Sequence, residues 1–98
     1  MNPPSEARFK FRLYIAGNTE NSARAVANLA EICKSLAPAG HEVEFVDVFR
    51  EPGRALEDRI FMTPTLLKLT PAPVQRIIGT LSKTQSVLQA LQLGDMGI

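Results

Sequence analysis

The sequence contains only one cysteine, Cys33, and this scarcity narrows the chemistry open to the chain. A single thiol cannot form an intrachain disulfide, which is typical of proteins in a reducing cytoplasm. The 98 residues are enough for one domain with its own apolar core. We therefore expect a cytoplasmic domain that folds without covalent crosslinks.

Long apolar runs, a strong net charge and ligand-binding motifs are also missing. No stretch approaches the roughly 20 apolar residues that span a bilayer. The formal net charge is only +1, so nothing favours a membrane or a nucleic acid as a partner. There is no glycine-rich phosphate loop and no GxSxG elbow. His41 is the only histidine, so the sequence predicts no metal site, no cofactor and no catalytic residue.

Hydrophobic periodicity predicts alternating strands and helices. The expected elements are a strand at 9–16, a helix at 22–36, a strand at 43–49, a short helix at 52–59, strands at 65–69 and 74–79, and a helix that begins after Ser82. The first strand–helix–strand passage implies a right-handed parallel βαβ unit. Residues 1–8 are expected to be a flexible lead-in, residues 9–94 the domain and residues 95–98 a loose tail.

The two long helices carry apolar stripes that should face the core. The expected stripe members are Val26, Leu29, Ala30, Cys33, Leu36 and Ala37 in the first helix, and Val87, Leu88, Leu91 and the weaker candidate Ala90 in the last. Ser82 and Gln85 match a capping box, and Gly94 is expected to end the last helix. Because Cys33 lies within its stripe, we expect a buried core residue.

A proline precedes the third expected strand, in Thr63-Pro64-Thr65. This position and the element order are those of an α/β, thioredoxin-like βαβαββα domain, in which such a proline lies beside the active site. The sequence favours a cis Pro64. A thiol enzyme on this fold needs a low-pKa cysteine at the start of the first helix, but residues 16–22 contain none. Binding is therefore expected rather than catalysis.

Several groups of residues form a specific combination across positions 9 to 93. They are Leu13 to Thr19 with Asn21 to Ala25, Val46-Asp47-Val48 with Pro52, Glu57 to Ile60 with Thr63 to Leu66, and Pro71 to Gly79. This combination resembles the KaiB family of bacterial circadian clock proteins.

The resemblance implies a non-catalytic regulator. Such a protein binds the KaiC-type hexameric ring ATPase and modulates its phosphorylation and ATPase cycle, in a circadian clock or a clock-like stress-adaptation system. A similar domain begins the sensor kinase SasA; because this chain ends at Ile98, a free-standing protein is expected. The family also switches between the thioredoxin-like monomer and a ground-state fold, βαββααβ, that forms oligomers. Self-association as a dimer or tetramer therefore stays open.

The resemblance also points to particular residues. The implied contact region is the first helix, the second strand and the short helix, with matching residues Arg24, Glu57, Asp58 and Arg59, and Arg76 on the fourth strand as a weaker candidate. Fold-switch candidates are Ala90 and Gln92, where many members carry glycine and aspartate. Both residues here form helices better, so we expect the thioredoxin-like state to be substantially populated.

Two other functions stay open from the sequence. One is a thiol-disulfide or glutathione-dependent enzyme, which would need a nucleophile near residues 18–22, where only Thr19 and Ser22 offer hydroxyls. The other is a thioredoxin-like adaptor with an unrelated protein partner.

Overall fold

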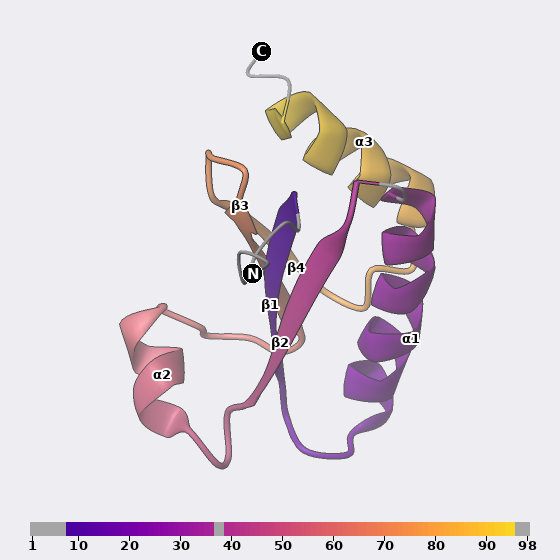
Figure 1. Cartoon of the computed structure of the whole chain (residues 1–98). Helices are drawn as coiled ribbons and strands as arrows, with labels where there is room; N and C mark the ends of the chain where they lie inside the picture. Colours follow the sequence, from indigo (N-terminus) through magenta and orange to yellow (C-terminus); the bar gives the residue numbers. More distant parts are fainter. Residues whose placement is uncertain (1–7, 37–38, 96–98) are drawn as a thin grey trace, which may run out of the picture.

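A four-stranded sheet forms the middle of the domain (Figure 1). The computed structural model describes residues 8–36 and 39–95. The elements are β1 (Phe9–Ile15), α1 (Glu20–Leu36), β2 (His41–Asp47), α2 (Pro52–Glu57), β3 (Thr65–Thr70), β4 (Gln75–Ile78) and α3 (Thr84–Asp95). The predicted βαβαββα order is therefore confirmed, with boundaries that differ by a few residues.

The strands lie in the order β2-β1-β3-β4. β1 and β2 are parallel, with Phe9 opposite His41 and Ile15 opposite Asp47. β3 runs antiparallel to both β1 and β4. The parallel βαβ unit is thus confirmed, and β2 and β4 are the two edges of the sheet.

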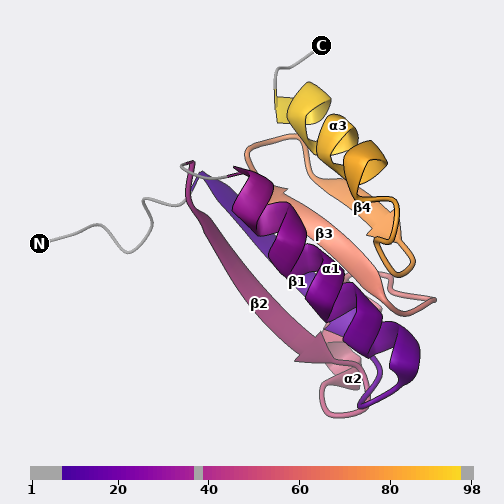
Figure 2. The same ribbon diagram turned by 90° about the vertical axis from the view of Figure 1, so that its right-hand side faces the viewer.

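Helices cover both faces of the sheet. Figure 2 shows α1 and α3 side by side on one face, whereas α2 lies beyond the other. The larger core lies under α1 and α3 and is formed by Phe9, Phe11, Leu13, Ala25, Leu29, Ile32, Cys33, Leu36, Leu66, Leu81, Val87, Leu88 and Leu91. A smaller core lies under α2 and contains Tyr14, Val46, Ala55 and Leu67.

The buried face of α1 is rotated relative to the predicted stripe. The buried residues are Ser22, Ala25, Leu29, Ile32, Cys33 and Leu36. The prediction is confirmed for Leu29, Cys33 and Leu36 but is wrong for Val26 and Ala30, which are exposed. Both line a groove beside β2, which is an edge strand of the sheet. Ala37 lies outside the described residues.

The last helix keeps its predicted apolar face but not its predicted ends. Val87, Leu88 and Leu91 are buried as expected, whereas Ala90 is exposed. The Val87 N–H donates to the Lys83 carbonyl at 3.0 Å, so Lys83, not Ser82, directly precedes the helix. α3 continues through Gly94 to Asp95, so neither the predicted stop nor a tail beginning at Asp95 is correct.

The start of the domain lies one residue earlier than expected. The Arg8 N–H donates to the Ala39 carbonyl at 3.2 Å, which attaches residue 8 to the chain before β2. The predicted lead-in therefore does not include Arg8. The other residues of the predicted lead-in and tail, 1–7 and 96–98, lie outside the described part of the chain.

The chain enters β3 through a tightly held turn. The Thr63–Pro64 peptide bond is cis, the isomer that the sequence favours. The Thr65 hydroxyl donates to the Met62 carbonyl at 2.7 Å, and the Gly79 N–H donates to the Pro64 carbonyl at 2.9 Å. The first bond closes the turn itself, and the second joins it to the end of β4.

Candidate protein-binding surface

A polar network pins the end of α2 to the sheet. The Tyr14 hydroxyl of β1 donates to Asp58 Oδ2 at 2.5 Å, with the Arg54 carbonyl oxygen at 3.1 Å. Arg12 Nη1 donates to the same Asp58 oxygen at 2.9 Å, and Arg12 Nε to Glu44 Oε1 at 2.9 Å. Arg54 closes the network on Glu44 at 2.7 Å. Asp58 therefore connects the end of α2 to β1 of the sheet.

The network stays in one charge state around neutral pH. Burial raises the pKa of Asp58, but hydrogen bonds from Tyr14 and Arg12 outweigh it and hold that pKa below its usual value. Hydrogen bonds from Arg54 and Arg12 lower the pKa of Glu44 to about 2. Burial, and then the bond to Asp58, raise the pKa of Tyr14 to about 12. At pH 7 Asp58 and Glu44 are therefore ionised and Tyr14 is neutral, so none of the three changes its protonation state near that pH.

Arg76 ties β4 to the segment after α2. Its Nη1 donates to the Arg59 carbonyl at 2.9 Å and its Nη2 to the Asp58 carbonyl at 2.7 Å. The Arg59 backbone has a φ of 56°. The structure thus brings together four of the expected site residues, Glu57, Asp58, Arg59 and Arg76. Of these, Glu57, Arg59 and Arg76 are exposed, whereas Asp58 is half-buried.

Arg24 lies apart from the other four. It is on α1, which covers the sheet face opposite α2 (Figure 2). Its side chain is exposed and pairs with Glu20, one turn earlier, at 2.6 Å. Such a solvent-exposed pair contributes little to stability, so Arg24 can exchange Glu20 for another acidic group at low cost.

Large apolar side chains surround the cis turn. Phe49, Phe61, Met62 and Ile78 are 72%, 85%, 60% and 54% exposed. One cavity of about 400 Å³ is lined by Arg59, Phe61, Met62, Thr65, Arg76 and Ile78. A second is lined by Ala16, Val48, Phe49, Ile60, Phe61, Met62 and Thr63.

Phe61 and Met62 line both cavities, so the two hollows lie next to each other. We call the residues Phe49, Arg59, Phe61, Met62, Arg76 and Ile78 the cis-proline surface. The site residues predicted from the sequence are all charged and do not include Phe61 or Met62. The sequence nevertheless contains a sign of their exposure. These two large apolar residues directly precede Thr63-Pro64 and belong to no strand or helix that would bury them.

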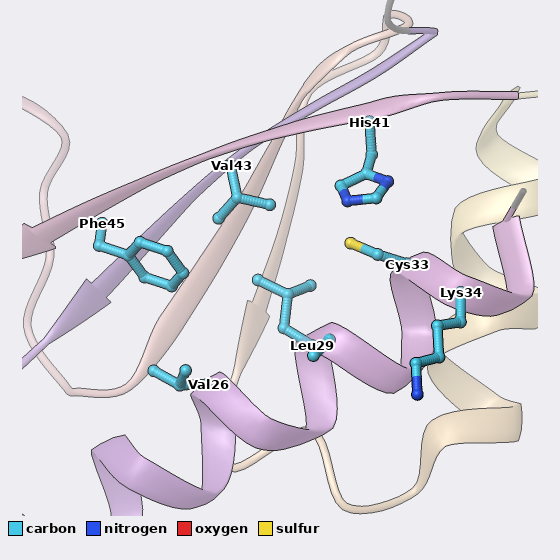
Figure 3. Close-up of a pocket in the computed structure, with 8 residues that line it drawn as sticks. Val26, Leu29, Cys33, Lys34, His41, Val43 and Phe45 are labelled. Carbon is cyan, nitrogen blue, oxygen red and sulfur yellow. The ribbon is translucent and has the colours of Figure 1, made fainter.

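A separate groove follows the β2 edge (Figure 3). It has a volume of about 460 Å³ and lies between α1 and β2. Val26, Leu29 and Cys33 face it from α1, and Val43 and Phe45 face it from β2.

Cys33, Thr19 and Ser22, the candidate nucleophiles, are poorly suited to nucleophilic chemistry. Burial raises the pKa of the Cys33 thiol to about 11, so almost none of it is thiolate at pH 7. The Thr19 hydroxyl donates to Ser22 Oγ at 2.7 Å, and Ser22 Oγ also accepts the Ala16 N–H at 3.0 Å. Both hydroxyls therefore serve the β1–α1 turn.

Metal-binding clusters and membrane-spanning helices are absent from residues 8–36 and 39–95. In these ranges, no three His, Cys, Asp or Glu side chains lie close enough to hold a metal ion. No helix there is long and apolar enough to cross a bilayer.

Comparison with known proteins decides the family. A family model described as the KaiB domain matches residues 12–93. The chain belongs to the KaiB family. Circadian clock protein KaiB3 from a Synechocystis species is 44% identical over 91 residues, covering 93% of this chain and 89% of the relative. Circadian clock oscillator protein KaiB from Prochlorococcus marinus strain NATL2A is 48% identical over 82 residues, covering 84% of this chain and 77% of the relative.

The expected resemblance is therefore confirmed for this KaiB-family chain. Its membership, with relatives named circadian clock proteins, makes it a clock-type regulatory protein rather than an enzyme.

Solved structures confirm the thioredoxin-like fold. The N-terminal domain of Synechococcus elongatus SasA superposes with a TM-score of 0.73 at 19% identity, covering 93% of this chain and 87% of that domain. Mitochondrial thioredoxin 3 from Saccharomyces cerevisiae gives 0.68 at 14% identity, covering 87% and 80%. At these identities the likeness concerns the fold alone, and it assigns no thiol chemistry to the KaiB-family chain.

Proposed function

We propose that the protein binds a KaiC-type hexameric ring ATPase in the cytoplasm and modulates its phosphorylation and ATPase cycle. The setting is a circadian clock or a related stress-adaptation system. Family membership and relatives named circadian clock proteins support this role. The buried single thiol supports a reducing compartment.

The cis-proline surface is the observation that carries the proposal. Aromatic residues, methionine and arginine are the residue types that protein interfaces favour over the rest of the surface. Phe61 is 85% exposed and Met62 60%, although both are strongly apolar. Exposed apolar groups gathered around adjacent hollows mark interaction sites.

The contacts within the domain divide the expected site residues into two groups. Arg59, Phe61 and Met62 are free to touch a partner directly, and Glu57 lies beside them. Asp58 and Arg76 act as positioning residues, since their polar groups hold the segment that carries Arg59. Arg24 would reach only a partner large enough to extend around the end of the sheet onto α1.

The test is the affinity for a purified KaiC ring with ATP, measured by fluorescence anisotropy of the labelled protein. Phe61→Ala should weaken binding by about tenfold or more, as expected for a central aromatic anchor. Arg59→Glu should also weaken binding and change its salt dependence. Arg24→Glu should have a smaller effect.

Val74→Ala is the matched control for Phe61→Ala. Val74 is also apolar and 62% exposed, but it precedes β4, at the opposite end of that strand from Ile78. Its removal should leave the affinity unchanged. Unaltered binding by both Phe61→Ala and Arg59→Glu would refute the surface. A wild-type protein that does not bind the ring would refute the partner and favour an adaptor with another one.

A further inference from the structure

Met62 is an exposed sulfur-containing residue. The chain has three methionines and one cysteine, and of these Met62 and Cys33 lie in the part that the structure describes, whereas Met1 and Met96 lie outside it. Met62 is 60% exposed and Cys33 only 4%. An oxidant in the solvent therefore reaches the Met62 thioether more easily than the Cys33 thiol.

The two sulfur groups also differ in the chemistry that oxidation requires. A thiol reacts with a peroxide as its thiolate, and burial raises the pKa of the Cys33 thiol to about 11. A thioether carries no proton, so the lone pair of its sulfur is available at any pH near neutrality. Burial and protonation thus both direct oxidation away from Cys33 and toward Met62.

Met62 lies where the two hollows of the cis-proline surface adjoin. It lines one hollow together with Arg59 and Arg76, and the other together with Phe49. Its backbone carbonyl accepts the Thr65 hydroxyl at 2.7 Å, so the turn fixes the position from which the side chain projects. A change in the polarity of this one side chain therefore alters both hollows.

The oxidised side chain would be polar at the place where an apolar contact is expected. The sulfur lone pair attacks one oxygen of hydrogen peroxide, the O–O bond breaks, and the products are the sulfoxide and water. The thioether loses two electrons and the peroxide gains them. Methionine sulfoxide reductases reverse the step: two thiols supply the electrons and protons, and the oxygen leaves as water.

Arg59 would add to the effect of the sulfoxide. Its side chain is exposed, and none of the ion pairs among the described residues involves it. A sulfoxide oxygen accepts hydrogen bonds, and the Arg59 guanidinium is a donor that lines the same hollow as Met62. Oxidation therefore removes an apolar contact and offers Arg59 an acceptor within its own domain.

We propose that Met62 is a reversible oxidation site, at which a peroxide converts the thioether to the sulfoxide and thereby weakens binding at the cis-proline surface. The effect on binding rests on the proposed function, because the partner there is the ring ATPase. The modification itself does not depend on any partner.

Tryptic mapping tests the modification. Cleavage after Arg24, Lys34, Arg59 and Lys68 places Met62 on peptide 60–68 and Cys33 on peptide 25–34. After the folded full chain is treated with hydrogen peroxide, peptide 60–68 should gain the mass of one oxygen atom, and peptide 25–34 should stay unmodified.

The unfolded chain is the control for this map, because both peptides should be oxidised once the fold no longer buries Cys33. Methionine sulfoxide reductases A and B with dithiothreitol should return peptide 60–68 to its original mass. An unmodified peptide 60–68, or equally fast oxidation of Cys33 in the folded chain, would overturn the proposal.

The affinity for a purified KaiC ring with ATP tests the consequence. Oxidation of the wild type should raise the dissociation constant by about tenfold or more, because a polar oxygen must then be buried in an apolar contact. The melting temperature should not change, since Met62 is on the surface. Reductase treatment should restore the affinity.

Met62→Leu is the matched variant, because leucine has a similar volume and no sulfur. Its affinity, whatever the starting value, should be the same before and after peroxide, which also accounts for any oxidation of Met1 and Met96. Undiminished binding by the oxidised wild type, or an equal loss in Met62→Leu, would overturn the proposal. A wild type that fails to bind before oxidation would instead refute the proposed function and, with it, the regulation, whereas the peptide map would still decide whether Met62 is oxidised.

Discussion

Removing the Tyr14 hydroxyl isolates the network that joins α2 to the sheet. Tyr14 has no exposed surface, and its ring packs with Val46, Ala55 and Leu67. In Tyr14→Phe the ring keeps this packing, so no cavity forms. What is lost is a hydrogen bond of 2.5 Å to the charged Asp58 carboxylate and a donor 3.1 Å from the Arg54 carbonyl.

The expected cost follows from the charge of the acceptor. Hydrogen bonds to charged groups contribute about 1.5–3 kcal/mol, and Asp58 keeps its bond from Arg12. We therefore expect Tyr14→Phe to lower the free energy of unfolding by about 2 kcal/mol at pH 7. For a domain of this size, the melting temperature should fall by about 8–16 °C.

Urea unfolding followed by circular dichroism measures this difference, and its pH dependence checks the cause. The folded pKa of Asp58 is lowered, so the contribution of its carboxylate is present above 3.8, the usual value, and is lost as the pH falls through the folded pKa. The gap between wild type and Tyr14→Phe should therefore shrink below pH 3.8.

A double-mutant cycle with Asp58→Asn completes the test. Tyr14→Phe should cost clearly less in the Asp58→Asn background, because the charged acceptor is already absent. The reasoning is refuted if the loss at pH 7 is under about 0.5 kcal/mol, within the range of an ordinary surface substitution. An equal loss in both backgrounds would also contradict it.

Two further predictions concern the thiol and the last helix. Cys33→Ala should leave ring-ATPase binding unchanged and lower stability by about 1 kcal/mol, and neither protein should reduce insulin; a loss of binding by the folded variant would show a direct role for Cys33. At low protein concentration, NMR secondary shifts over residues 84–95 should be helical, and Ala90→Gly combined with Gln92→Asp should move the population toward the ground-state fold, since glycine alone costs a helix about 1 kcal/mol. Strand-like shifts in the wild type would contradict the first expectation, and an unchanged double variant the second.

The element order could be predicted because each segment carries its own periodicity and stop signals. Phe9, Phe11 and Leu13 alternate clearly, and Val87, Leu88 and Leu91 define one helical face, so burial agrees with the pattern. The buried face of α1 differs from the predicted stripe because small and apolar residues occur almost all around that helix. Which of Ala25, Val26 and Ala30 is buried depends on where the sheet ends, and that is a tertiary property.

The candidate site was less predictable than the fold. The alternation of β1 puts Tyr14 on the face opposite Leu13, but its complete burial depends on α2 returning across the sheet. Asp58 and Arg76 are charged, so the sequence predicts that they contact solvent or a partner. In the structure their side chains bind groups within the domain. Phe61 and Met62 form the cis-proline surface only because the turn exposes them, and no periodic pattern records this.

The strand order has a consequence for how the molecule can come apart. β2 and β1 come from the first half of the chain, β3 and β4 from the second, and only β1 and β3 pair between the halves. The strands of the two halves therefore meet in a single β ladder, with Leu13 opposite Leu66 near its centre. The packing of α1 on α3 reinforces this contact. Opening that ladder would release β3, β4 and α3 as one piece and leave β1–α1–β2 closed on itself. The β1–β2 pairing can therefore persist while the second half is rearranged, and the larger core that the two halves share is what such a rearrangement must rebuild.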